Sequence, residues 1–226
     1  MKKIIVTIGI LTTLAVASSY AQGTVVFGNA TTTKISTNAG PNGVTGVGLV
    51  TANANQTFYY ALFYSTSQTT VSGSSAAVIG LNGGTYAFNA SGWTDGNANG
   101  YSTNSGAGRL QTSSPNTDGS YSVGGLAGGA SASFVIVGWS ANIGSTITAL
   151  QQYLAAPTQN GWVGESAVGG PLTTGILGST PAIGLFGASS PNIPGFILGE
   201  VTVPEPGTMA LCALGGASML LFRRKK

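Results

Sequence analysis

Short runs of apolar and aromatic residues, separated by clusters of Gly, Asn, Ser and Pro, fill the chain between residues 22 and 203. Runs of this length, bounded by turn signals such as Asp118-Gly119, predict short β-strands. The predicted strands are Thr24–Phe27, Val44–Val50, Thr57–Tyr64, Ala76–Leu81, Thr85–Asn89, Arg109–Thr112, Tyr121–Val123, Ser131–Ser140, Gly161–Val168, Ala182–Phe186 and Phe196–Val203. Many short strands with frequent turns favour an all-β, sandwich-like domain.

One segment departs from the strand pattern. In Thr146–Ala156 the apolar residues Ile147, Leu150 and Leu154 recur at helical spacing. Ser145 stands where a capping residue is expected, and Pro157 follows as a stop signal. The pattern predicts one short helix that bridges two strands.

The N-terminal end has the three parts of a secretory signal peptide. A positive start, Met1–Lys3, precedes the apolar run Ile4–Ala17, and Ser19–Ala21 supplies small residues at the expected cleavage positions. We expect cleavage between Ala21 and Gln22, so that residues 1–21 are a signal peptide and the following domain is exported. An uncleaved anchor is the alternative, but the run is shorter than the ~20 residues of a membrane span.

The C-terminal end combines a Pro-rich boundary, Val203–Pro206, an uncharged stretch, Gly207–Phe222, and a basic tail, Arg223–Lys226. As a helix, the stretch would rise about 24 Å, and snorkelling basic side chains would compensate for the shortfall against a ~30 Å hydrocarbon core. The positive-inside rule places the tail in the cytoplasm and the preceding domain outside. The pattern predicts a single transmembrane helix at 207–222. An ordinary membrane anchor with a Pro-rich boundary is the alternative interpretation.

This arrangement resembles the PEP-CTERM sorting domain of Gram-negative bacteria over residues 203–226. Pro204, Glu205 and Pro206 match its Pro-Glu-Pro motif, whereas Gly207 stands where the family more often has Ser. The resemblance implies that an exosortase, a membrane-embedded processing enzyme, is the partner. It also implies a cell-surface or extracellular-matrix destination in bacteria that make exopolysaccharide and biofilm. The expected organisation is a signal peptide (1–21), an exported β-rich domain (22–202) and a sorting domain (203–226).

The charge of the exported domain excludes one class of function. The chain carries a formal net charge of +3, but its Lys and Arg residues concentrate at the two ends. Between residues 22 and 203, two bases, Lys34 and Arg109, stand against four acids, which gives about −2. Two cations cannot form the basic surface that nucleic-acid binding requires. The chain also has no His and one Cys, Cys212, so we expect no His-dependent catalysis, no zinc site and no cofactor.

The four acids of the domain give weak support to catalysis. Asp95 and Asp118 each precede Gly in turn sequences, where we expect them to cap backbone amides. Glu200 fits a solvent-facing position on the last strand, and Glu165 is the acid most worth testing. The segment from Asp95 to Gly100 matches the first half of a calcium loop, but its twelfth position is Gly, so a turn is the better interpretation. We expect no enzyme activity, with a glycoside hydrolase that uses Glu165 as a minor alternative.

The tryptophans suggest a second function for the domain. Trp93 and Trp162 are flanked by small or polar residues, and we expect them to be more exposed than Trp139. A flat aromatic face can stack against a sugar ring, although aromatic residues in strands mostly serve packing. The sequence thus leaves a structural or matrix-associated envelope protein as the first hypothesis and a carbohydrate-binding module for exopolysaccharide as the alternative.

Overall fold

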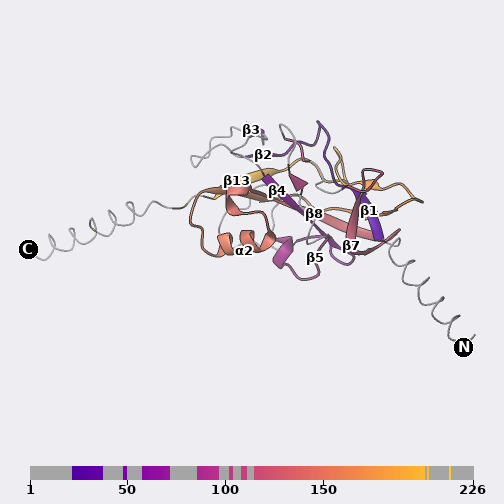
Figure 1. Ribbon diagram of the computed structural model, residues 1–226, viewed down its shortest axis with the longest axis horizontal. Helices are drawn as coiled ribbons and strands as arrows, with labels where there is room; N and C mark the ends of the chain where they lie inside the picture. The colour runs from indigo at the N-terminus through magenta and orange to yellow at the C-terminus, as the bar shows by residue number, and fades with distance from the viewer. Residues whose placement is uncertain are drawn as a thin grey trace, which may run out of the picture.

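The computed structural model describes residues 22–37, 48–49, 58–71, 86–96, 102–103, 108–110, 115–201, 203 and 214, with the backbone alone at 48–49 and 102–103. These residues form two β-sheets and one short α-helix, so the all-β class is confirmed (Figure 1). The predicted signal peptide lies outside the described residues, as does the predicted transmembrane helix apart from Leu214. Among the helices described, none has the length and apolar character needed to cross a membrane.

The larger sheet is organised around one long antiparallel pair. β4 (Phe58–Ser65) pairs with β8 (Ser131–Ser140) over its whole length, from Phe58 opposite Ser140 to Ser65 opposite Ser133. The described strands of this sheet run in the order β3 (Gly48–Leu49), β2 (Ser36–Thr37), β13 (Ile197–Val201), β9 (Gly161–Glu165), β8, β4, β5 (Thr94–Asp95), with β10 (Gly169–Thr173) also on β8 and β6 (Ser102–Thr103) also on β4.

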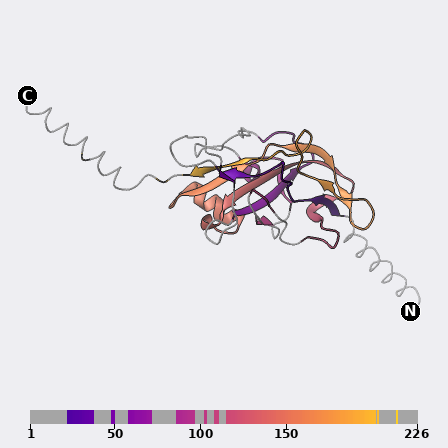
Figure 2. The same cartoon turned by 90° about the horizontal axis from the view of Figure 1, so that it is seen from above.

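The smaller sheet is built around the first strand. β1 (Gln22–Val26) pairs antiparallel with β7 (Tyr121–Ala127) and β11 (Gly175–Ile176), and parallel with β12 (Ile183–Gly184). β1 begins near one end of the domain, whereas β13 ends near the other (Figures 1 and 2). The two ends of the described domain therefore point in opposite directions.

The large sheet is buried on both faces, which explains why β4 and β8 read as continuous apolar runs rather than alternating ones. On one face, alternate side chains of β4 and β8 pack against the small sheet to form a sandwich core. This core includes Tyr60, Leu62, Phe134, Ile136, Val25, Phe27 and Tyr121, all nearly fully buried.

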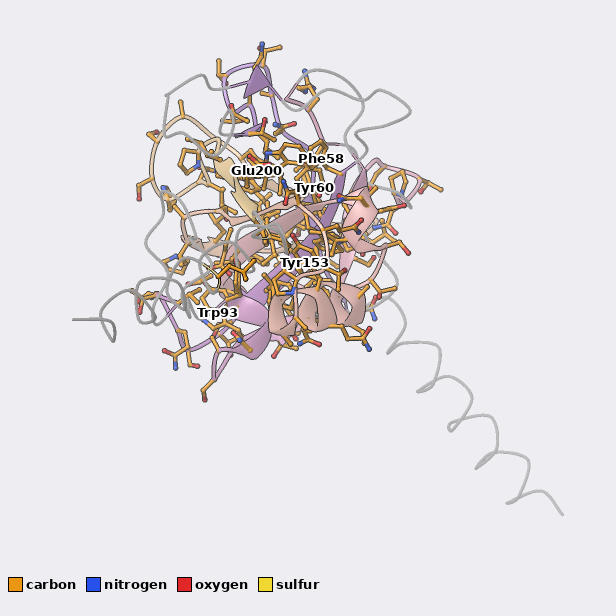
Figure 3. The ribbon with its side chains drawn as sticks, turned by 90° about the vertical axis from the view of Figure 1, so that its left-hand side faces the viewer. Phe58, Tyr60, Trp93, Tyr153 and Glu200 are labelled. Carbon is orange, nitrogen blue, oxygen red and sulfur yellow. The ribbon has the colours of Figure 1, made fainter. Side chains whose placement is uncertain are left out.

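The opposite face of the large sheet packs against helical elements. Its residues include Phe63, Val137 and Trp139, and they contact side chains of α2 (Ile147–Ala155) and of the 3-10 turns η2 (Ala87–Asn89) and η3 (Ala141–Ile143). Figure 3 shows α2 beside the strands, with Tyr153 on the side that faces them.

The helix is confirmed, although it spans Ile147–Ala155 rather than the predicted Thr146–Ala156 and has a different cap. Leu150 is buried, while Ile147 and Leu154 pack at the margin of the same core. Thr146, rather than the predicted Ser145, is the N-cap: its hydroxyl accepts the N–H of Ala149 at 3.1 Å. The capping oxygen must reach the third residue of the helix, and the helix begins one residue later than Ser145 would allow.

Some predicted strands differ from those observed. Ser131–Ser140 is confirmed at both ends, whereas Thr85–Asn89 was predicted as a strand and its residues 87–89 form a 3-10 turn. Ala76–Leu81 lies outside the described residues, and so does most of Val44–Val50. Of the predicted strand at 109–112, the described residues 109 and 110 are not in a strand.

Candidate functional site

β13 is the strand that directly precedes the predicted sorting segment. The last three residues of this strand pair with β9 in the register Gly199–Val163, Glu200–Trp162 and Val201–Gly161. Two residues further on, the backbone N–H of Val203 donates to Oδ1 of Asn160 at 2.9 Å. The side chain of Asn160 therefore holds the chain at the residue that precedes Pro204.

The residues predicted for sorting and cleavage lie at the two ends of this domain. Pro204, Glu205 and Pro206 fall outside the described residues, as does Ala21. Gln22 is described: it is the exposed first residue of β1 and lies opposite Ala127 of β7. Gln22, the residue that follows the predicted signal cleavage point, is therefore already part of a strand.

The two predicted sugar-stacking residues do not lie together. Trp162 is half-buried and packs against the sandwich core, with its ring edge-on to Phe58 at a centroid distance of 6.4 Å. Trp93 is half-buried against the core of the opposite face, and its indole N–H donates to the carbonyl of Thr70 at 3.3 Å. Both are more exposed than Trp139, as expected, but they lie on opposite faces of the large sheet and cannot form one platform.

The carboxylate of Glu165 is buried within the fold. The residue is 3% exposed, and its Oε2 accepts the backbone N–H of Ala87 at 2.6 Å. Its partner is 78 residues away in the sequence, so no local pattern could have revealed the contact. The arrangement fixes the turn η2 to the sheet and leaves the carboxylate away from solvent.

The other carboxylates are dispersed. Asp118 accepts the N–H of Ser120 at 3.0 Å, which confirms the predicted capping role in this turn. Asp95 lies in β5 opposite Phe63, and Glu200 is half-buried on β13. The calcium-like segment extends from Asp95 into residues outside the described part. Within the described ranges, no three Asp, Glu, Cys or His side chains gather as metal ligands.

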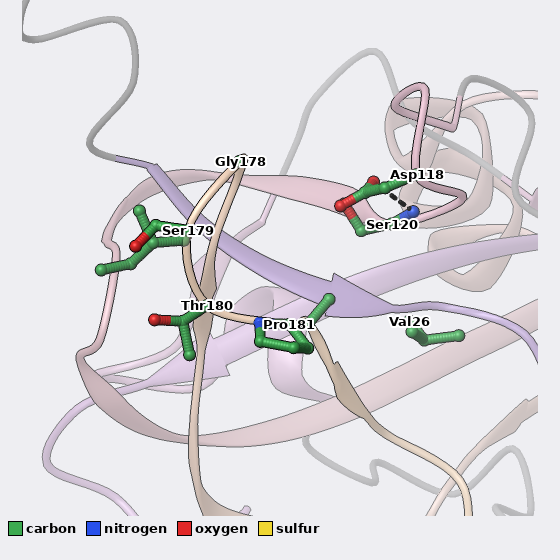
Figure 4. Close-up of a pocket in the computed structure, with 9 residues that line it drawn as sticks. Val26, Asp118, Ser120, Gly178, Ser179, Thr180 and Pro181 are labelled. Carbon is green, nitrogen blue, oxygen red and sulfur yellow. Dashed lines mark hydrogen bonds between the residues drawn. The ribbon is translucent and has the colours of Figure 1, made fainter.

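A surface cavity of about 390 Å³ lies beside β1. Figure 4 shows Asp118 and Ser120 on one side of this strand, with Thr180 and Pro181 of the turn Gly178–Pro181 on the other. Hydrogen bonds from the side chain and backbone of Ser120 lower the pKa of the exposed Asp118 carboxyl, which is therefore ionised at neutral pH. The cavity is lined by Val26, Asp118, Ser120, Ile176, Gly178, Ser179, Thr180, Pro181 and Ala182.

Sequence reasoning missed this cavity because its two walls are some 60 residues apart in the chain. Its volume falls within the ~300–1,000 Å³ range of small-molecule sites. The lining combines hydroxyl groups and one carboxylate with apolar side chains, which suits a ligand that carries several hydroxyl donors.

The geometry defines a two-sheet β-domain that runs directly into a C-terminal sorting segment. Residues 202–225 match the family model of the PEP-CTERM protein-sorting motif. The match begins one residue after the end of β13, and its second residue, Val203, donates its N–H to Asn160. The chain therefore carries the sorting signal of an exported exosortase substrate. No curated protein and no solved structure gives a match to the chain.

Proposed function

We propose that the protein is a structural component of the cell envelope or extracellular matrix, associated with biofilm or exopolysaccharide and delivered there through its PEP-CTERM signal. The observation that carries the proposal is the direct continuity of the folded domain with the matched segment 202–225. The described chain has few charges and two extensively paired sheets, which suits a stable, passive domain outside the cell.

The route of delivery follows from the two terminal signals. A signal peptide at 1–21 would start export, and the apolar stretch at 207–222 would hold the precursor in the inner membrane with the basic tail 223–226 inside. An exosortase would then act near Pro204–Pro206, and the domain would reach the cell surface or matrix.

A double substitution in the motif tests this proposal. We expect Pro204→Ala with Pro206→Ala to leave the protein in the membrane fraction of its native cells, whereas the wild type reaches the surface or matrix fraction. Pro115→Ala is the matched control, since Pro115 is an exposed proline of the domain. Unchanged distribution of the double variant between fractions would contradict the proposal.

A second candidate function is binding of exopolysaccharide. The cavity beside β1 supports it better than the two tryptophans, because Trp93 and Trp162 lie on opposite faces of the sheet. A pull-down with native polysaccharide should retain the wild type, and Asp118→Asn should weaken retention if the cavity binds sugar. Loss of retention in Trp93→Ala, with Asp118→Asn unaffected, would instead favour stacking.

We propose no catalytic role for the domain. A hydrolase that uses Glu165 would need its carboxylate to reach a substrate, but this group is buried and bonded to Ala87. If a hydrolytic activity were found, its survival in Glu165→Gln would show that Glu165 is not responsible.

A further inference from the structure

Asn160 stands where the pairing of β13 with β9 would otherwise continue. The observed register ends at Val201 opposite Gly161, so its extension by one pair places residue 202 opposite Asn160. Instead of a backbone carbonyl, the side-chain Oδ1 of Asn160 accepts the N–H of Val203. This one side chain adds a hydrogen bond to the domain two residues beyond the last paired residue of β13.

Neighbouring groups fix the position of this acceptor. The backbone carbonyl of Asn160 accepts the side-chain N–H of Asn142 at 2.6 Å, and Gln159 donates to the carbonyl of Asn142 at 2.5 Å. Tyr153, which is buried on α2, donates its hydroxyl to the carbonyl of Gln159 at 2.8 Å. The loop that carries Asn160 is therefore attached to both α2 and η3, the turn that follows β8, so its acceptor is held in place.

The sequence gives the Val203 hydrogen bond particular weight. Pro204 has no backbone N–H, so Val203 supplies the last backbone donor before Glu205. The following proline also restricts Val203 to an extended conformation. An enzyme that takes an extended segment into its cleft pairs with the backbone donors and acceptors of that segment. The N–H of Val203 cannot serve Asn160 and such an enzyme at once.

We propose that Asn160 is a positioning residue that retains Val203 on the domain and thereby slows the transfer of the sorting motif to its processing enzyme. The inference rests on the proposed function, because it concerns the rate of that processing step. Loss of one hydrogen bond of this kind should raise the processing rate roughly two- to tenfold.

The test is a pulse-chase experiment on the full-length protein in its native cells, with precursor and processed forms separated by gel. Asn160→Ala should be processed roughly two- to tenfold faster than wild type. Asn160→Asp keeps an oxygen acceptor and makes the hydrogen bond charge-assisted, so its processing should be no faster than wild type. Asn89→Ala, at an exposed Asn of η2 remote in sequence from the chain exit, is the matched control and should match wild type.

The outcomes separate this inference from the proposed function. If the wild type is never processed, the proposed function fails. If the wild type is processed and Asn160→Ala proceeds at the same rate, the positioning role alone is overturned. Faster processing of Asn160→Asp than of the wild type would also overturn the positioning role. The Asp variant gives this test even if Asn160→Ala folds poorly. Amide exchange at Val203 gives an independent measurement, since it should accelerate in Asn160→Ala and not in Asn160→Asp.

Discussion

Tyr60 and Gly138 lie directly opposite each other in the β4–β8 pair, and the tyrosine ring fills the space above the glycine. A Cβ atom on Gly138 would lie 2.8 Å from two carbons of that ring and 3.1 Å from Leu198. Gly138 also pairs with Gly164 of β9, where a Cβ would lie 2.5 Å from the carbonyl oxygen of Ile197. Gly138 thus provides the room in which the Tyr60 ring packs, and Gly164 provides the room in which Ile197 and Leu198 of β13 approach the sheet.

Gly138→Ala should destabilise the domain because the added methyl group would overlap the Tyr60 ring. Overpacking of this kind costs about 1–3 kcal/mol. Urea unfolding of the purified protein measures the loss. Gly184→Ala is the control, since its Cβ would meet nothing within 4 Å, and it should change stability by less than about 0.5 kcal/mol. Equal stability of the two variants would contradict the packing described.

Tyr60→Phe should leave the stability unchanged or raise it slightly. The Tyr60 hydroxyl is buried and has no hydrogen-bond partner within the described part of the chain. Removal of an unsatisfied buried polar atom gains up to about 1 kcal/mol, since its desolvation is no longer required. The same unfolding measurement checks this, and a clear loss of stability would mean that the hydroxyl has a partner in the folded protein.

The domain should lose stability at alkaline pH through its buried tyrosines. Burial, and secondarily the negative charge of Glu200, raises the pKa of Tyr153 from 10.0 to about 12. Burial also raises the pKa of Tyr60, and burial followed by the charge of Glu165 raises that of Tyr86. Each folded-state pKa exceeds its unfolded value, so the folded state keeps its protons longer.

The stability contributed by these groups is therefore fully present below about pH 10 and falls between pH 10 and 12. Unfolding curves recorded across this range test the expectation. Tyr153→Phe should show a shallower fall than wild type, because one proton fewer is released on unfolding. A stability that rises between pH 10 and 12 would contradict the sign.

Glu165→Ala should destabilise the domain more than Glu165→Gln. The alanine variant leaves the buried N–H of Ala87 without the acceptor it has at 2.6 Å, which costs about 1–3 kcal/mol. The glutamine variant keeps an oxygen at the same position and should lose less. The denaturant concentrations at the unfolding midpoints of the two variants measure the difference. Equal midpoints would contradict the role of Glu165 in holding η2 against the sheet.

The local pattern of apolar residues predicted those elements that do not depend on contacts with distant residues. The run at 131–140 is apolar on both faces, so its limits were predicted correctly. At 85–89 the alternation of Tyr86, Ala87 and Phe88 imitates a strand, whereas the segment is held as a turn by the distant Glu165. The strand at 169–173 was missed because Gly170 and Pro171 suggest a loop. Its register shifts between Gly169 and Leu172, and a proline is tolerated at such an irregularity.

The candidate site likewise has one part that the sequence predicts and one part that it does not. The sorting motif is a contiguous signal, and its prediction over residues 203–226 is confirmed by the family match at 202–225. The contact between Asn160 and Val203 spans 43 residues, and the cavity beside β1 joins two distant loops. Such contacts depend on strand register and packing, which a single sequence does not specify.

Mass spectrometry of both termini of the mature protein decides whether the domain is cleaved at both of its terminal signals. Protein purified from each fraction of its native cells should begin at Gln22 and, in the surface or matrix fraction, end near Pro204–Gly207. An intact C-terminal Lys226 throughout, with all of the protein in the membrane fraction, would mean that the motif is not processed and that the C-terminal segment is a permanent single-span anchor.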